Sequence, residues 1–246
     1  MKNSLKAWVC SGKCFLYLAL GTVGAMLLAR AIGSKMFLPV AMTLVIYPVY
    51  ALDLSQGRRD LAFFHTFFWA LVASVTMICL VRYDDGAMAK VVFKSVSYRD
   101  EMFRWILTGE GPEGNVKLFL PQHMKNYIFF CASSLLTAGV WGLAFGTILL
   151  NYMNFYVGSL SLHAHHPLIV YVFGWPVWSL LRVVGFMLCG IALSEPVLSQ
   201  FFRYRLDSRK NAQYFLAGLV FILLDILLKA TLASFWRTLL RGAVSF

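Results

Sequence analysis

Long uninterrupted apolar runs constrain this sequence more than any other feature. Residues 61–81 and residues 127–150 contain no Asp, Glu, Lys or Arg. A hydrocarbon layer about 30 Å thick requires about 20 apolar residues in helical form to cross it. Both runs are long enough, so the sequence predicts a membrane-spanning helix at each.

Weaker runs lie on either side of these two. They are residues 15–29, 37–52, 167–194 and 211–236. The first is similar to a signal peptide, but we expect a retained membrane helix. Pro39 and Pro48 leave two alternatives for 37–52, a kinked span or a segment that turns back inside the membrane. Gly174-Trp175-Pro176 interrupts 167–194.

Backbone groups in lipid must satisfy their own hydrogen bonds, so these runs are predicted to be helices. They also lack the alternating ten-residue pattern of a transmembrane barrel. The predicted fold is an all-α polytopic transmembrane bundle of five or six helices, one of them broken or re-entrant. It forms a single integral membrane domain over residues 1–246.

The composition excludes most other classes of protein. Hydrophobic residues make up 60% of the chain and charged residues 13%, against about 45–50% and about 25% in typical soluble domains. A net charge of +11 would suggest nucleic acid in a soluble protein, but membrane proteins gather basic residues in cytoplasmic loops. We therefore expect the lipid bilayer and other membrane protein subunits, or further copies of this chain, as partners. Nucleic acid is not expected.

Loop charges predict an orientation. Residues 82–125 contain seven Lys and Arg residues, residues 203–210 contain four, and residues 151–166 contain none. The positive-inside rule therefore places 83–125 and 203–210 in the cytoplasm and 151–166 outside, across a prokaryotic cytoplasmic (inner) membrane. The stretch 83–125 is amphipathic. It either lies on the lipid surface or packs on the end of the bundle.

Three histidines form the first candidate site. His163, His165 and His166 lie within four residues, and imidazole is a common ligand of transition metals. They could supply part of a Cu or Zn site. The alternative is a polar interfacial loop beside aromatic anchors, with no cofactor.

Three charged residues lie inside the apolar runs. Asp225 and Lys229 are four residues apart, a spacing that brings two side chains of a helix together. Arg182 should face protein, water or an acidic partner, because a charge in lipid is costly. Two alternatives follow, a structural ion pair between Asp225 and Lys229 or a polar path that all three residues line.

Glycines mark one predicted helix as a packing element. Gly139, Gly142 and Gly146 lie in the run 127–150, and the last two form a GxxxG pattern. Small residues at this spacing let helices approach closely. The pattern does not say whether the neighbouring helix belongs to the same chain.

Common catalytic signatures are absent. The sequence has no P-loop, no GxSxG, no HExxH and no GxGxxG motif. We therefore expect a non-enzymatic membrane subunit or scaffold of a larger complex. The alternatives are a small transporter or channel with a polar path near Arg182, Asp225 and Lys229, and a metal-linked membrane enzyme subunit.

The C-terminal half resembles a known family. Asn126, the helix LLTAGVWGLAFGTILLNYMNFYVG (135–158), the broken segment FGWPVWSLLRVVGFMLCG (173–190) and Asp225 together resemble the stage II sporulation protein M family over residues 122–240. The resemblance implies a polytopic protein of membrane assemblies, with no catalytic residues to carry over. The family often has a His-Gly and a Glu near the break, which this chain lacks.

Overall fold

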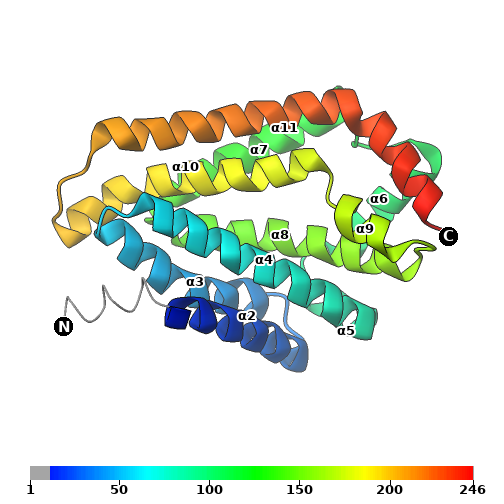
Figure 1. The fold of residues 1–246 in the computed structure, drawn as a ribbon, viewed down its shortest axis with the longest axis horizontal. Helices are drawn as coiled ribbons and strands as arrows, with labels where there is room; N and C mark the ends of the chain where they lie inside the picture. Colours follow the sequence, from blue (N-terminus) through cyan, green and yellow to red (C-terminus); the bar gives the residue numbers. More distant parts are fainter. Residues whose placement is uncertain (1–11, 246) are drawn as a thin grey trace.

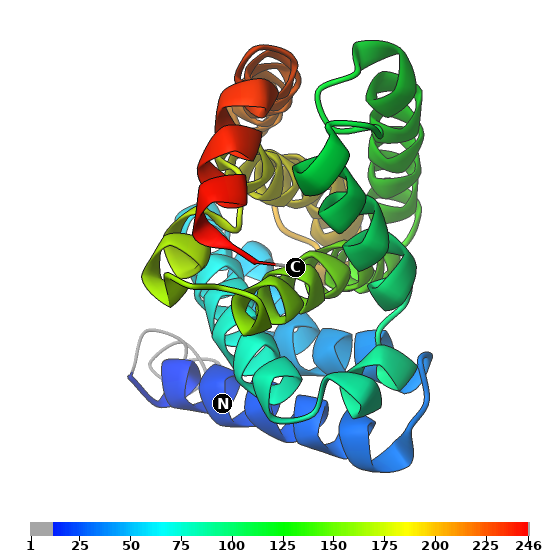
Figure 2. The ribbon, with the colours of Figure 1, turned by 90° about the vertical axis from the view of Figure 1, so that its right-hand side faces the viewer.

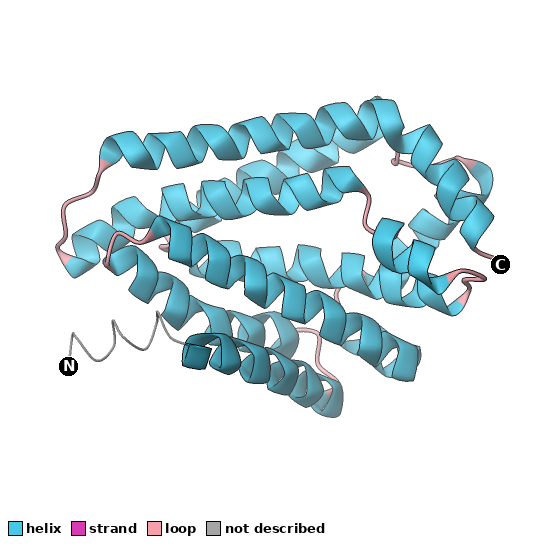
Figure 3. Ribbon diagram, in the orientation of Figure 1, coloured by secondary structure: helices cyan, strands magenta, loops and turns pink. Residues whose placement is uncertain are grey.

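The computed structural model describes residues 12–245, and their regular structure is helical (Figure 3). This confirms the predicted all-α bundle. The helices are α2 (Gly12–Ile32), α3 (Phe37–Ser55), α4 (Arg59–Tyr83), α5 (Asp85–Val91), α6 (Ser95–Thr108), α7 (Val116–Leu136), α8 (Val140–Leu162), α9 (Pro167–Phe173), α10 (Val177–Phe202) and α11 (Ser208–Ala243).

Six of the described segments are long and apolar enough to cross a membrane, namely α2, α3, α4, α8, the α9–α10 pair and α11. Large apolar side chains on their outer faces are exposed, among them Leu20, Leu44, Leu71 and Leu223. A soluble protein rarely leaves so much apolar surface uncovered. The protein is therefore an integral membrane protein whose outer faces contact lipid.

The long helices run side by side in alternating directions (Figures 1 and 2). α2, α3 and α4 pack together on one side, α8 packs against α3 and α4, and α10 joins them to α11. Buried apolar side chains of α3, α4 and α8 fill the centre, including Met42, Trp69, Met77 and Phe155. α7 packs on α8 and α10.

One predicted span is wrong, because residues 127–150 form two helices. α7 ends at Leu136 and α8 begins at Val140. Between them Ala138 and Gly139 have positive φ angles of 52° and 92°, a conformation that ends a helix. The Gly139 N–H donates to the Ser134 carbonyl at 2.8 Å. An uncharged run does not reveal such a turn, so hydropathy alone suggested one span.

This turn also makes the predicted orientation wrong. Phe103 of α6 stacks edge-on against His163 at 5.6 Å, and Arg82 donates to the Ser161 carbonyl. The stretch 82–115 and the loop 163–166 therefore share one end of the bundle, whereas 203–207 lies at the other end (Figure 1). Residues 151–162 belong to α8 and are not a loop. Both ends carry basic residues, so loop charge does not distinguish them.

The remaining alternatives are resolved as follows. α3 is continuous through Pro48, with Pro39 in its first turn, where proline is tolerated; the segment 37–52 is not re-entrant. The break at Gly174–Pro176 is confirmed and separates α9 from α10. α6 buries Trp105 and Ile106 against α8 and α11. The amphipathic stretch therefore packs on the end of the bundle.

A capping carboxylate joins α2 to the start of α5. Asp84 accepts a hydrogen bond from the Ala87 N–H at 2.9 Å and forms an ion pair with Arg30 at 2.8 Å. Both contacts lower the pKa of Asp84 below its ordinary value, because they stabilise the charged carboxylate. The hydrogen bond from the Ala87 N–H has the larger effect on the pKa, and Arg30 has the next largest. This contact ties two helices together at the end that also carries α6.

Candidate binding cavity

A cavity of about 90 Å³ lies inside the bundle. α8 lines it from Gly142 to Met153, which is about 17 Å of helix length at 1.5 Å per residue. The walls are mainly apolar and aromatic, and they include Phe130, Leu143, Leu149, Phe186 and Ile222.

An ion pair forms part of the wall. Arg182 of α10 donates from Nε and Nη2 to the two carboxylate oxygens of Asp225 on α11, at 2.8 and 2.9 Å. The Asp225 side chain is 1% exposed and that of Arg182 is 17% exposed. A planar guanidinium matches a carboxylate with two parallel hydrogen bonds, which an ammonium group does not.

The predicted partner of Asp225 was therefore wrong. Lys229 forms an ion pair with Glu113, and its ammonium group lies 4.7 Å from the ring centre of Phe119. Glu113 enters from the glycine-rich segment 109–114 and is buried. Positive φ angles at Gly109, Gly111 and Gly114 allow this path. Nothing in the sequence of the stretch 83–125 marked Glu113 as a buried residue, and it was not predicted.

His123 of α7 lies at the same end of the cavity. Its Nδ1 is 3.1 Å from the Phe119 carbonyl oxygen, and its Nε2 is 3.8 Å from Asp225 Oδ2. A carbonyl oxygen can only accept a hydrogen bond, so Nδ1 carries the proton. In the neutral ring Nε2 is then an acceptor. A lone histidine gives no signal in the sequence, and its role was not predicted.

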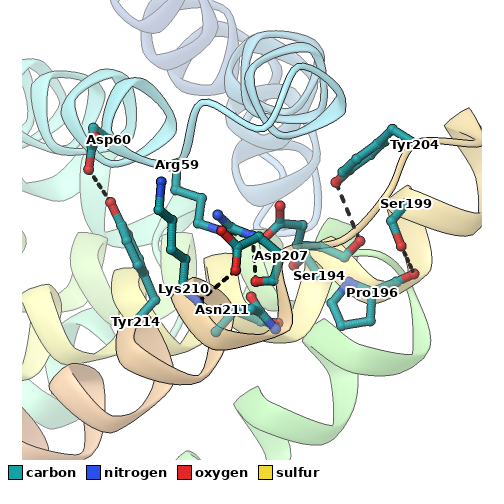
Figure 4. Close-up of polar contacts among 12 residues, drawn as sticks. Arg59, Asp60, Ser194, Pro196, Ser199, Tyr204, Asp207, Lys210, Asn211 and Tyr214 are labelled. Carbon is teal, nitrogen blue, oxygen red and sulfur yellow. Dashed lines mark hydrogen bonds and ion pairs between the residues drawn. The ribbon is translucent and has the colours of Figure 1, made fainter.

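A second group of buried charges lies beyond the opposite end of the cavity, which Tyr50 lines. Figure 4 shows the polar contacts around Arg59 and Asp207 in this group. Arg59 Nε donates to Glu195 Oε2 at 2.5 Å, and Arg59 Nη2 donates to the Asp207 carbonyl at 3.2 Å. Tyr50, which lines the cavity, donates to Ser194 Oγ at 3.0 Å. Glu195 directly follows the apolar run 167–194, and the structure buries it completely.

Another buried pair lies near this group. His65 Nδ1 is 2.7 Å from Asp53 Oδ2, and both side chains are 0% exposed. Phe15 of α2 lies against the imidazole, with ring centres 5.0 Å apart. The pair links α3 to α4 at the end of the bundle where α2 begins.

The predicted packing glycines have different surroundings. A methyl group added at Gly142 would overlap the Ser134 hydroxyl of α7, so this position brings α7 and α8 of the same chain together. Gly146 lines the cavity, and a methyl group there would meet only Phe130, at 4.0 Å. Gly139 forms the turn between the helices.

The loop with His163, His165 and His166 lies next to the last described residues, 243–245, in space. The His165 N–H donates to the Ala243 carbonyl at 3.0 Å, and the His163 carbonyl accepts from the Ser245 N–H at 2.9 Å. Among residues 12–245, no group of three His, Cys, Asp or Glu side chains is placed to hold a metal ion. The Cu or Zn site stays a prediction.

Comparison with protein-family models, with curated proteins and with solved structures gives no match. The resemblance to the stage II sporulation protein M family is therefore also a prediction, and the geometry of the cavity carries the functional argument.

Proposed function

We propose that this protein is a non-enzymatic transporter that takes a small molecule into the cavity between its helices. The observation that carries the proposal is the cavity itself, with the Arg182–Asp225 pair in its wall. Ionisable groups inside a membrane are costly to insert, and they commonly mark the route of a substrate or ion. The role as a subunit of a larger complex, which the sequence favoured, stays a prediction.

The number of buried carboxylates supports transport. Asp225 is the only carboxylate within the apolar runs named in the sequence analysis. The structure buries Asp53, Glu113 and Glu195 as well, and each lies near a basic side chain. Buried carboxylates with basic neighbours therefore occur near both ends of the bundle.

Paired charges lie beyond both ends of the cavity. Lys229 is one helical turn from Asp225 and pairs with Glu113, while Glu195 follows Ser194 and pairs with Arg59. Separation of one pair would open the cavity on one side while the other pair keeps the opposite side closed. Alternating access to a fixed site requires two such barriers.

Accessibility of Gly146 to water-soluble reagents tests the proposal. In a chain whose native cysteines are replaced, Gly146→Cys should react with a charged methanethiosulfonate reagent. Leu223→Cys, on the lipid-facing side of α11 and 65% exposed, is the control and should not react. In sealed vesicles, Glu113→Gln should speed the reaction from one side and Glu195→Gln from the other. If Gly146→Cys stays unreactive in both backgrounds, the transport proposal is refuted.

A further inference from the structure

We propose that an open hollow between the first turns of α4 and α11 binds the head group of a zwitterionic phospholipid with a primary ammonium group, the chemistry of phosphatidylethanolamine. The phosphate lies beside Lys210 and Arg59, and the ammonium group beside Asp60. The inference does not rest on the proposed transport. The size and depth of the hollow, the charges that line it and the apolar surface that continues from it carry the argument.

The hollow has a volume of about 450 Å³. Its floor is α10, which packs on both α4 and α11 (Figure 1). The residues that line it include Arg59 and Asp60 of α4, Leu188 of α10, and Lys210, Gln213 and Tyr214 of α11. Small-molecule sites have volumes of about 300–1,000 Å³, so a phosphoethanolamine group fits here, and the acyl chains of the lipid stay outside.

The hollow lies at the depth of lipid head groups. Asp60 directly precedes the apolar run 61–81, and Lys210 directly precedes the apolar run 211–236. Both runs belong to helices that are long and apolar enough to cross a membrane. The two charged side chains therefore lie where the hydrocarbon layer ends and the head groups begin.

The lining carries one unpaired charge of each sign. Within the described chain, the ammonium group of Lys210 forms no ion pair, and Asp60 has no basic partner. The charge of Arg59 is offset by Glu195. A ligand with one anionic and one cationic group matches this arrangement, whereas a purely anionic head group places its charge beside Asp60 with nothing to offset the carboxylate.

Hydrogen bonding favours a primary ammonium group over a quaternary one. The Tyr214 hydroxyl donates to Oδ1 of Asp60, and Oδ2 accepts no hydrogen bond from the described residues (Figure 4). An ethanolamine N–H can donate to this oxygen, but a choline group has no N–H. Phosphate oxygens can accept from Lys210 and from Nη1 of Arg59, which makes no hydrogen bond within the described chain.

Apolar surface for the acyl chains continues from the hollow on two helices. Phe64 and Phe67 follow Asp60 by four and seven residues on α4, and Val220 follows Gln213 by seven residues on α11. Residues at these steps share one face of a helix. All three apolar side chains are exposed, so a lipid whose head group occupies the hollow can lay its chains against them.

Three phospholipids with identical palmitoyl and oleoyl chains test the inference: phosphatidylethanolamine, phosphatidylcholine and phosphatidylglycerol. Each is added to the detergent-purified full chain, and bound lipid is measured by native mass spectrometry. Phosphatidylethanolamine should bind about fivefold more tightly than either of the others, the effect of one exposed ion pair. Equal or tighter binding of phosphatidylglycerol would overturn the match to a zwitterion, and equal binding of phosphatidylcholine would overturn the N–H contact.

Variants locate the head group. Asp60→Asn should lose the preference for phosphatidylethanolamine and bind phosphatidylglycerol more tightly than the native chain does, because Lys210 is then the one unpaired charge in the lining. A misfolded variant would lose both lipids, so this gain separates the two cases. Lys210→Gln should weaken binding of both lipids. Lys117→Gln, which removes an exposed lysine of α7 at the other end of the bundle, is the control and should change neither. If Asp60→Asn keeps the preference, or the two lysine variants lose equally, the hollow is not the site.

Discussion

Removal of the Asp225 carboxylate should expose the energetic role of the ion pair in the cavity wall. Asp225→Leu leaves the guanidinium of Arg182 without either of its two hydrogen bonds, in a position where it is largely shielded from solvent. Loss of one partner from a buried pair costs about 3–5 kcal/mol. For a chain of this length, that corresponds to a fall in thermal midpoint of roughly 6–20 °C.

The double variant identifies the partner. Asp225→Leu with Arg182→Met replaces both charges by apolar groups, which is often neutral or stabilising, by about 1–4 kcal/mol, so most of the lost stability should return. Asp225→Leu with Lys229→Met leaves both Arg182 and Glu113 unpaired and should be less stable than either single variant. The assay is thermal unfolding of the detergent-purified variants, followed by tryptophan fluorescence. Rescue by Lys229→Met and not by Arg182→Met would refute the pairing and restore the partner that helical spacing suggested.

Three further predictions follow from the fold. Gly142→Ala should lower the thermal midpoint, because the methyl overlaps a side chain of α7, whereas Gly146→Ala should leave it unchanged or raise it, since alanine favours a helix by about 1 kcal/mol over glycine. Single cysteines at Glu110 and His165 should be labelled from the same side of a sealed vesicle; labelling from opposite sides would contradict the α7–α8 hairpin. The lowered pKa of Asp84 means that its stabilising contribution is present above about pH 3.9 and is lost as the pH falls through the folded-state pKa. Asp84→Ala should remove this acid dependence in thermal unfolding.

The class of fold could be predicted because the bilayer requires each spanning helix to have a certain length and to be apolar. Both properties can be read from one continuous run of residues. The sequence could not predict the turn at Ala138 and Gly139, since no charged residue separates α7 from α8. The orientation was wrong for the same reason, as one undetected turn reverses the direction of every later helix.

The cavity was only partly predictable. Arg182 and Asp225 stood out because charges are rare in apolar runs. Their pairing depends on how α10 packs on α11, and spacing along one helix contains no information about that contact. Glu113 and His123 lie in polar or mixed sequence, where a carboxylate or an imidazole is ordinary. Glu113 becomes notable only when the chain buries it, and His123 only when the fold brings it 3.8 Å from Asp225.

The α7–α8 turn has a consequence for the two ends of the chain. Phe15 lies against His65 near the start of α4, and the final residues of the described chain pair with the His163 loop at the far end of the bundle (Figure 1). The described chain therefore starts and finishes at opposite ends of the bundle, which we expect to face different aqueous compartments. Fluorescent proteins or protease sites fused to its two ends would report opposite environments, and a cytosolic binding factor could reach only one of them.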